Sequence, residues 1–424
     1  MKSLFVIFLS AICNLAFSQA WQQLMVNTSS NLHSVFFLDA DTGYTVGQNG
    51  VIFKTTDGGA NWDGQTSGVS SQLNAVYFVD ALTGFAVGDD GVILNTQDGG
   101  ANWSTQLSGT TLELLSVYFV DSSNGYIGKR ATGAEPSSIL KTTNGGTTWT
   151  PISTGYVTDL YSIFFTSTNV GFGCGETPMS LNTYLLNTND GGANWSNQNS
   201  NTTNIMNSIF FPTALTGYAC GFGSTFIKTI DGGTNWVATV LPVNGTYMST
   251  FFTSEQTGFI VGAGVGNYPV IMKTTDGGAN WVEPSESFVG TLNSVHFPDA
   301  QTGYACGTVG LMIKTNNGGL THIENMNESS PGFKLHQNFP NPFTAETTIH
   351  FQLSENSDVE LKLYDVNGRE VKTLISEKLI TGEYSIHFSA KDELVSGVYY
   401  YKLILNSESD GKYYTGVRKM IYQQ

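Results

Sequence analysis

The residues of this 424-residue chain that could do chemistry are mainly carboxylates, and one group of them recurs in a short turn. The turn reads Thr55-x-Asp57-Gly58-Gly59-x-Asn61-Trp62, and we call it the Asp-Gly-Gly turn. Its acid recurs as Asp98, Asp190, Asp231 and Asp276, and asparagine replaces it at Asn144 and Asn317. Five such acids could bind calcium or take part in catalysis. Asparagine keeps the hydrogen bonds of the turn but not the charge, so we predict a structural role for all seven positions.

A second group of acids lies on loops of variable length. Glu135 and Glu176 could form the carboxylate pair that hydrolyses a glycosidic bond if they lay about 5–10 Å apart. Solvated loop acids are the more common case, so we keep a glycoside hydrolase as the alternative function.

Other chemistry is sparse. The six histidines lack metal-ligand spacing, and we predict neither a metal site nor a cofactor. Cys174, Cys220 and Cys306 each precede a glycine in the same slot of a repeat, which indicates small core residues rather than disulfides. Residues 19–330 hold 7 Lys and Arg against 22 Asp and Glu. An excess of 15 negative charges argues against nucleic-acid binding.

The amino terminus is typical of a secretory signal peptide. Met1-Lys2-Ser3 is positively charged, residues 4–12 are apolar, and Ala16-Phe17-Ser18 fits a cleavage site. We therefore predict a signal peptide over 1–18, and no transmembrane segment in the remaining chain.

Self-similarity predicts the elements that position these residues. The turn's tryptophan recurs at spacings of 41, 46, 46, 41 and 45 residues, and each unit holds four short runs of alternating apolar residues. Four strands per unit of this length predict an all-β fold, a seven-bladed β-propeller over 19–324. The blades are predicted to start at Leu32, Leu73, Leu115, Leu160, Met206, Met248 and Leu292. The segment at Trp21 matches a fourth strand, so we predict that it completes the seventh blade.

The loops predict where binding takes place. In an up-and-down blade, the loop between strands two and three lies on the face opposite the Asp-Gly-Gly turns. Three of these loops are longer than the others, at 129–138, 175–184 and 263–268. Variable loops on a rigid scaffold usually carry binding. We predict lining residues Lys129, Arg130, Glu135, Glu176, Tyr184, Asn267 and Tyr268.

Two resemblances follow from the repeat. The Asp-Gly-Gly turn resembles the Asp box of sialidases, which grip the substrate carboxylate with three arginines, whereas residues 19–324 hold only Arg130. The whole repeat, with its T-G-Y/F-x-V-G and D-G-G-x-x-W motifs, resembles the photosystem II stability/assembly factor propellers. That resemblance implies a protein-binding propeller without catalysis. It also implies an arginine-rich binding surface in photosynthetic members, which this acidic chain lacks.

The remaining segment is separated from the propeller by a polar linker, 325–332. Alternating runs over 333–424 predict a small antiparallel, Ig-like β-sandwich. The segment resembles the type A C-terminal sorting domain of the type IX secretion system of Bacteroidetes. The motif positions are Asn338, Pro340, Asn341, Pro342, Gly368, Arg369, Gly397 and Lys419. The resemblance implies export across the outer membrane by the type IX machinery.

Together these observations predict an exported monomer at the cell surface or in the medium, which binds an extracellular protein or glycan without catalysis. A glycoside hydrolase is the first alternative. An assembly-factor role for a membrane complex, as the resemblance implies, is the second.

Overall fold

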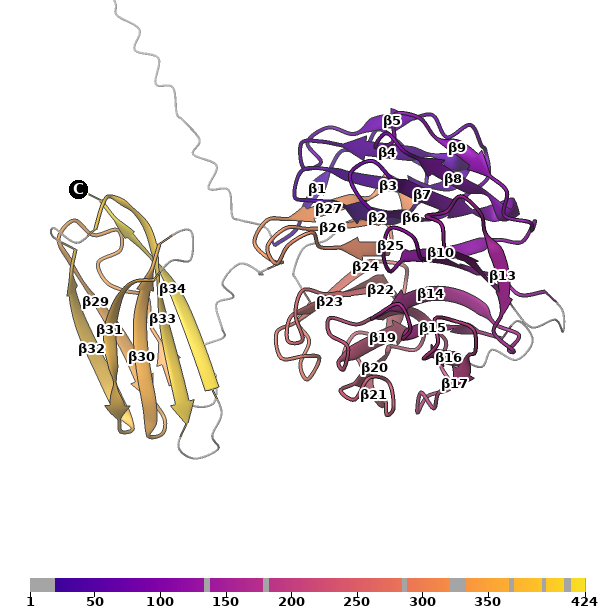
Figure 1. Cartoon of the computed structure of the whole chain (residues 1–424). Coiled ribbons are helices and arrows are strands. Elements are labelled where there is room, and N and C mark those ends of the chain that lie inside the picture. The colour runs from indigo at the N-terminus through magenta and orange to yellow at the C-terminus, as the bar shows by residue number, and fades with distance from the viewer. Residues whose placement is uncertain are drawn as a thin grey trace, which may run out of the picture. The chain divides into compact units, whose positions relative to one another are not determined.

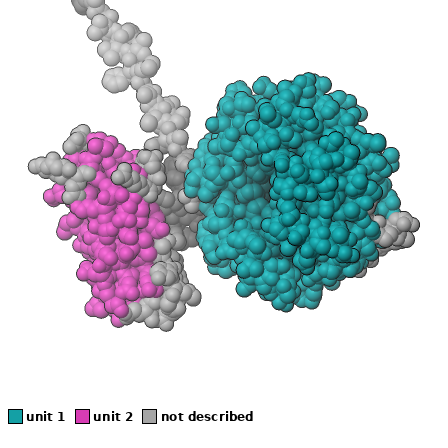
Figure 2. Space-filling model, in the orientation of Figure 1, with its two compact units in different colours: residues 1–320 teal, residues 321–424 magenta. Residues whose placement is uncertain are grey.

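The computed structural model describes residues 20–132, 138–177, 183–283, 288–319, 333–365, 370–390, 394–407 and 413–423. The chain divides into two compact units, 1–320 and 321–424, coloured separately in Figure 2. The predicted signal peptide, the end of the predicted propeller at 324 and the linker at 325–332 lie outside the described residues. Within the described residues, none of the helices has the length and apolar character needed to span a bilayer.

Unit 1 consists of seven antiparallel sheets in its described part, and it is the predicted propeller. Figure 1 shows the first strands of the blades around the centre, with β5, β9, β13, β17 and β21 at the periphery. Blades one to three comprise β2 (Leu32–Phe37), β3 (Gly43–Gly47), β4 (Ile52–Thr55) and β5 (Asp63–Gln65); β6 (Leu73–Phe78), β7 (Gly84–Gly88), β8 (Ile93–Thr96) and β9 (Ser104–Gln106); β10 (Leu114–Phe119), β11 (Gly125–Lys129), β12 (Ser138–Thr142) and β13 (Thr150–Ser153).

Blades four to seven repeat this up-and-down order. They comprise β14 (Asp159–Phe165), β15 (Gly171–Glu176), β16 (Thr183–Thr188) and β17 (Ser196–Asn197); β18 (Met206–Phe210), β19 (Gly217–Gly221), β20 (Thr225–Thr229) and β21 (Val237–Val240); β22 (Gly245–Phe252), β23 (Gly258–Gly264) and β24 (Pro269–Thr274); β25 (Leu292–His296), β26 (Gly303–Gly307), β27 (Met312–Thr315) and β1 (Gln22–Leu24). In blade six, a bridge between Lys273 and Val282 takes the place of the fourth strand.

Strand β1 closes the ring, as the sequence predicts. It pairs antiparallel with β27, with Gln22 opposite Lys314 and Leu24 opposite Met312. Trp21 is fully buried just before it, and its ring meets those of Phe259 and Phe297 edge to face at 6.1 and 5.8 Å. The amino-terminal strand and blade seven therefore bury one another's edges.

Two of the predicted blade starts are wrong by one residue. Each first strand has a β-bulge, so that Leu32 pairs with Gly47 and Ser34 with Val46, while His33 between them has no pairing partner. In blade three the buried residue of the pair is Leu114, not Leu115, and in blade six it is Tyr247, not Met248. The bulge changes which residue faces the core, and consecutive apolar residues hide that change from pattern reading.

An aromatic layer joins neighbouring blades. Phe78, at the end of its first strand, stacks on Tyr44 of the previous blade at 3.8 Å and meets Trp103 of its own blade edge to face at 6.0 Å. Such pairs contribute roughly 0.5–1.5 kcal/mol each beyond burial. The same phenylalanine recurs as Phe37, Phe119, Phe165, Phe211, Phe252 and Phe297.

The three cysteines lie in this core as free, buried thiols, which agrees with the prediction. Burial raises the pKa of Cys174, Cys220 and Cys306, and that of Cys306 reaches about 12. We expect Cys174, Cys220 and Cys306 to resist a thiol reagent at pH 8 in the native chain and to react once it is unfolded. Rapid labelling of the native chain at any of the three, read by peptide mass spectrometry, would contradict this packing.

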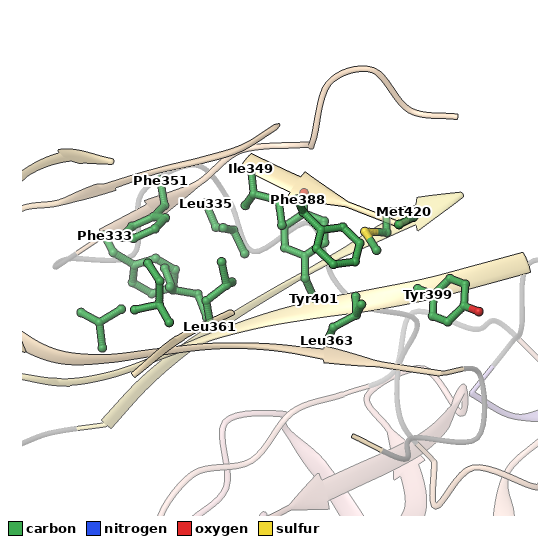
Figure 3. Close-up of a cluster of buried hydrophobic side chains, with 14 of the residues drawn as sticks. Phe333, Leu335, Ile349, Phe351, Leu361, Leu363, Phe388, Tyr399, Tyr401 and Met420 are labelled. Carbon is green, nitrogen blue, oxygen red and sulfur yellow. The ribbon is translucent and has the colours of Figure 1, made fainter. Parts of the chain in front are cut away.

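Unit 2 is a two-sheet β-sandwich, as predicted. One sheet has the order β28-β29-β32 and the other β31-β30-β33-β34. The strands are β28 (Phe333–Leu335), β29 (Glu346–Leu353), β30 (Ser357–Tyr364), β31 (Glu370–Leu379), β32 (Gly382–Ser389), β33 (Gly397–Ser407) and β34 (Tyr413–Tyr422). Figure 3 shows the side chains between the sheets, among them Phe351, Leu361 and Tyr401.

Candidate binding face

Backbone hydrogen bonds assign the turns and loops to two faces. In every blade the first glycine of the Asp-Gly-Gly turn donates its N–H to the turn between strands one and two, as Gly58 does to Asp41 at 2.9 Å. We call this side the turn face. On the other side, the loop after the second strand bonds to the connection that enters the blade, as Gln48 N–H does to Asn31 O at 2.9 Å. We call this side the loop face, and the faces are allotted as the sequence predicts.

The carboxylates of the Asp-Gly-Gly turns accept hydrogen bonds from residues of the same turn. Asp57 Oδ1 accepts the Asn61 N–H at 2.9 Å and the Thr55 hydroxyl at 2.9 Å. Asn144 makes the equivalent bonds through its own Oδ1, from Thr148 N–H at 3.0 Å and Thr142 at 2.8 Å. The same arrangement recurs at Asp98, Asp190, Asp231 and Asp276, and the threonine contact also recurs at Asn317. These contacts account for all seven positions as turn-forming residues.

Blade two offers a direct test of that role. Hydrogen bonds from Asn102 lower the pKa of Asp98 to about 2. We expect Asp98→Asn to lower the melting temperature only slightly at neutral pH, because its Oδ1 can accept the two bonds that Asn144 Oδ1 accepts, while the bond from Asn102 Nδ2 to Asp98 Oδ2 is lost. Asp98→Ala should lower it by several degrees, because the N–H of Asn102 and the hydroxyl of Thr96 lose their acceptor. Equal melting temperatures for the two variants in calorimetry would argue against a structural role.

Lysines of the third strands are used between blades. Lys54 Nζ lies 5.5 Å from the centre of the Tyr44 ring and donates to Gly99 O of the next blade at 2.7 Å. The same pair of contacts recurs at Lys141, Lys228, Lys273 and Lys314. Five of the seven Lys and Arg residues of 19–330 are thus held under the Asp-Gly-Gly turns.

Seven aromatic rings, one from each blade, surround the propeller axis. Neighbouring centroids are 4.6–5.5 Å apart, and the ring planes differ by 38–60°. Seven blades share a full turn, so neighbouring blades are rotated by about 51° about the axis. The angles between neighbouring ring planes are close to this value, so the ring planes are parallel to the axis. At these separations the faces of neighbouring rings lie opposite one another at an angle. The members are Phe36, Tyr77, Tyr118, Phe164, Phe210, Phe251 and His296.

This aromatic ring lies near the turn-face ends of the first strands. The edges of the seven side chains point towards the axis, so this circle of side chains narrows the central channel there. Burial lowers the pKa of His296 to about 4, and its Nδ1 accepts the N–H of Phe37 at 3.3 Å. His296 therefore serves as a neutral member of the ring. We call the loop-face opening of the central channel, beyond this narrowing, the mouth.

The bulged residues surround that mouth. In three blades the bulged residue is an asparagine whose amide donates to a first-strand carbonyl of the next blade. In blade four the bulged residue is Tyr161, whose hydroxyl makes a short hydrogen bond to Glu176. The seven bulged residues are His33, Asn74, Leu115, Tyr161, Asn207, Met248 and Asn293.

One part of the loop face is acidic. Arg130 binds Glu113 at 2.6 Å and Asp159 at 3.1 Å, while Asp159 also accepts the N–H of Ala131 at 2.8 Å. In blade two, Asp89 accepts from Asn74 at 2.9 Å and Asp90 from Ser71 at 2.8 Å. We define the acidic sector as Asp89, Asp90, Glu113, Asp159 and Glu176, with Lys129 and Arg130 as its two cations.

The structure brings some of the predicted lining residues together. Arg130 and Glu176 both lie in the acidic sector, linked through Asp159 and Tyr161. Lys129 is only 9% exposed, and burial lowers its pKa, so it lines the interior more than the surface. Glu135 lies outside the described residues, and its distance from Glu176 stays a prediction.

The other predicted residues lie elsewhere. Tyr184 packs against Tyr156, in the connection that enters its own blade, with ring centroids 5.3 Å apart. Asn267 and Tyr268 belong to the hairpin between β23 and β24 of blade six, two blades from Glu176. Beside β16 and β17, amide and hydroxyl groups line an open hollow of about 400 Å³, which includes Thr183, Asn197 and Gln198.

Of an apolar sector opposite the acids, sequence reasoning predicted only Tyr268. Phe222 follows the second strand of blade five and is 44% exposed, in the position that Gln48 and Asp89 occupy in blades one and two. Val265 and Val309, on the loops of blades six and seven, are 76% and 60% exposed. We define the apolar sector as Phe222, Met248, Val265, Tyr268, Val289 and Val309, all exposed. The available signal was an apolar residue at loop positions where other repeats carry polar ones.

The motif residues of unit 2 also take defined positions. Asn338 is buried, donates to Pro340 O and Thr347, and its N–H binds the Tyr401 hydroxyl at 2.7 Å. Asn341 bonds to Lys419 O and Ile421 N–H, which ties the motif to β34. Pro340 and Pro342 both follow cis peptide bonds, and Gly397 begins β33. Gly368 and Arg369 lie outside the described residues.

Comparison with known proteins assigns the repeats. The model of the photosynthesis system II assembly factor YCF48 family matches residues 13–105, 65–156 and 192–284, more than half of the chain. The chain belongs to this family. Residues 337–420 match the secretion system C-terminal sorting domain, so the YCF48-like propeller is followed by a type IX sorting domain that marks it for the cell surface or the medium.

Individual relatives are more distant. Over 47 residues the chain is 43% identical to the photosystem II assembly lipoprotein Ycf48 of Prochlorococcus marinus, a match that spans only 14% of that protein. A solved structure of YCF48 bound to D1 peptide has a TM-score of 0.58 at 18% identity, covering 70% of this chain and 97% of its own. PorZ, a surface component of the type IX secretion system of Porphyromonas gingivalis, has a TM-score of 0.51 at 13% identity, covering 96% and 60%. At these identities the structural likeness establishes the fold.

Proposed function

We propose that unit 1 is an exported binding module that captures a protein segment on its loop face without catalysis. The observation that carries this proposal is the apolar sector, where six large side chains are exposed around one side of a channel mouth. Exposed apolar side chains gathered on one face of a soluble protein mark an interaction site. A YCF48 relative of the same fold has been solved with a peptide bound, which supports a peptide as the type of ligand.

The charged chemistry of the loop face supports binding over turnover. Asp159 is engaged by Arg130 and by the N–H of Ala131, and Glu176 by Tyr161. Carboxylates held in such bonds are placed to orient a partner. The hollow beside β16 and β17 offers amides and hydroxyls that sugar hydroxyls could use, so the test needs a glycan arm.

The test compares matched substitutions on the two faces of the full chain. A random-peptide display library and a glycan array are screened with the wild-type chain, with Phe222→Ser on the loop face, and with Leu82→Ser on the turn face, where Leu82 is 59% exposed. We expect enriched peptides whose binding is lost in Phe222→Ser and kept in Leu82→Ser. Binding that survives Phe222→Ser, binding of glycans alone, or hydrolysis of a polysaccharide would contradict the proposal.

A further inference from the structure

The loop face has two chemically different halves, and their residues lie at the same height along the propeller axis. The same hydrogen bond to the connection that enters the blade is made in five blades, by the N–H groups of Gln48, Asp89, Arg130, Phe222 and Thr308. The residues after the second strands therefore form one ring around the mouth. Blades two to four supply the acidic sector to this ring, and blades five to seven supply the apolar sector.

The apolar sector is continuous across its blades. Ser224 N–H bonds to Gly245 O at 3.0 Å, and Val265 N–H bonds to Asn244 O at 3.2 Å, so the loops of blades five and six flank one segment. Gly290, next to Val289, lies against the side chain of Val309 in blade seven. The loop-face segments 220–226, 241–250, 262–270 and 305–312 contain no Asp, Glu, Lys or Arg, whereas the connection that carries Val289 contains Glu283 and Glu286.

Val309 adds a second, independent observation. Its φ is +55°, in the left-handed region that a β-branched side chain adopts only at a cost. The equivalent residues of blades one and two are Asn49 and Asp90, with φ of +61° and +58°, and both types tolerate this region. An exposed valine in this place loses backbone stability and gains no core packing. Strain of this kind is typical of a site where the side chain itself is needed.

The acidic sector keeps an excess of negative charge. Its five carboxylates face two cations, of which Arg130 is already bound to Glu113 and Asp159. The five other lysines in the described part of unit 1 are held under the Asp-Gly-Gly turns and cannot neutralise it. A partner that covers both halves must therefore bring positive charge to blades two to four and apolar side chains to blades five to seven.

We infer that the loop face binds an extended peptide segment with lysine or arginine at one end and large apolar side chains at the other. This inference rests on the proposed function and specifies its ligand. The aromatic ring narrows the channel below the mouth, so the segment lies across the mouth from one sector to the other. The asparagines of the mouth already bind the next blade, so recognition falls to the two sectors.

The test uses three synthetic peptides of one length, measured with the full chain by fluorescence anisotropy. The first has Lys and Arg in one half and Leu and Phe in the other, the second replaces the cations with glutamate, and the third replaces the apolar residues with serine. We expect the first to bind at least about tenfold more tightly than the others at low salt, and its advantage over the glutamate peptide to shrink as salt rises.

Two variants separate recognition from folding. Val309→Asn places a residue that Asn49 already shows to fit this backbone, so it should preserve or raise the melting temperature while weakening the first peptide about fivefold or more. Asp89→Asn with Asp90→Asn should weaken it mainly at low salt. Leu82→Ser on the turn face is the matched control and should bind as the wild type does.

The outcomes distinguish the inference from the proposed function. If Phe222→Ser abolishes peptide binding but the glutamate peptide binds as tightly as the cationic one, the inference is wrong and the proposed function stands. If Phe222→Ser and Val309→Asn leave binding of every peptide unchanged, or only glycans bind, both are wrong.

Discussion

Deletion of the segment from Trp21 to Leu24 is expected to unfold the propeller at temperatures where the intact chain is stable. This segment supplies the outer strand of blade seven and its three backbone-paired residues, Gln22, Gln23 and Leu24. It also supplies Trp21, which is fully buried against Phe259 and Phe297. Without it, the edge of β27 and one face of the inter-blade aromatic layer are open to water.

Single substitutions give the magnitude. Trp21→Ala removes a fully buried indole, a change that costs roughly 3–5 kcal/mol in protein cores. Trp21→Phe should cost much less, because the ring contacts persist and the buried Nε1 has no hydrogen-bond partner among the described residues. The measurement is chemical denaturation followed by tryptophan fluorescence and circular dichroism. Equal stabilities for the alanine variant and the wild type would mean that the ring does not depend on this closure.

Acid is expected to destabilise the propeller through His296 between pH 6.5 and 4, above the range in which Asp98 and Asp190 titrate in the folded chain. Burial lowers the pKa of this imidazole from 6.5 to about 4. Above pH 6.5 the residue is neutral in both the folded and the unfolded chain. As the pH falls towards 4, His296 is protonated in the unfolded chain but stays neutral in the folded chain. The free energy of unfolding therefore decreases, by up to about 3 kcal/mol.

The variant His296→Phe should remove most of this loss. The other six positions of the aromatic ring are phenylalanine or tyrosine, so the new ring fits the site, although the N–H of Phe37 loses its acceptor. The pKa of Asp98 and Asp190 is lowered to about 2, so their contribution is lost only below pH 4 in both proteins. The measurement is the free energy of unfolding from pH 7 to pH 4.

His33 provides the control for that experiment. Burial also lowers its pKa, and asparagine takes its place at the same bulge in three other blades, so His33→Asn tests a second, half-buried histidine at the opposite end of the strand. A His296→Phe curve parallel to that of the wild type between pH 6.5 and 4 would assign the acid sensitivity to other groups.

The repeat made the architecture predictable because its signals are local. Six of the seven Asp-Gly-Gly turns place a polar side chain, two glycines with positive φ and a tryptophan within eight residues, so copies could be aligned and counted. The lone Trp21 segment then implied ring closure. The sorting domain was similarly predictable, because Asn338, Asn341 and the prolines lie in one short motif.

What could not be predicted depends on contacts between blades. The bulge that buries Leu114 and exposes Met248 is a property of strand pairing, and neighbouring apolar residues fit either register. The aromatic ring needs seven side chains from seven blades to meet around one axis. Most of the apolar sector was missed because Phe222, Val265 and Val309 are single residues in glycine-rich loops, and their grouping follows only from the order of the blades.

The loop face as the binding surface is tested most directly by hydrogen–deuterium exchange of the full chain with and without the cationic, apolar peptide. We predict slower exchange in the peptide complex at residues 222–224, 245–248, 264–268 and 308–310 and at 89–90, with unchanged exchange at the Asp-Gly-Gly turns. Protection confined to those turns, or to residues 333–423, would contradict the account.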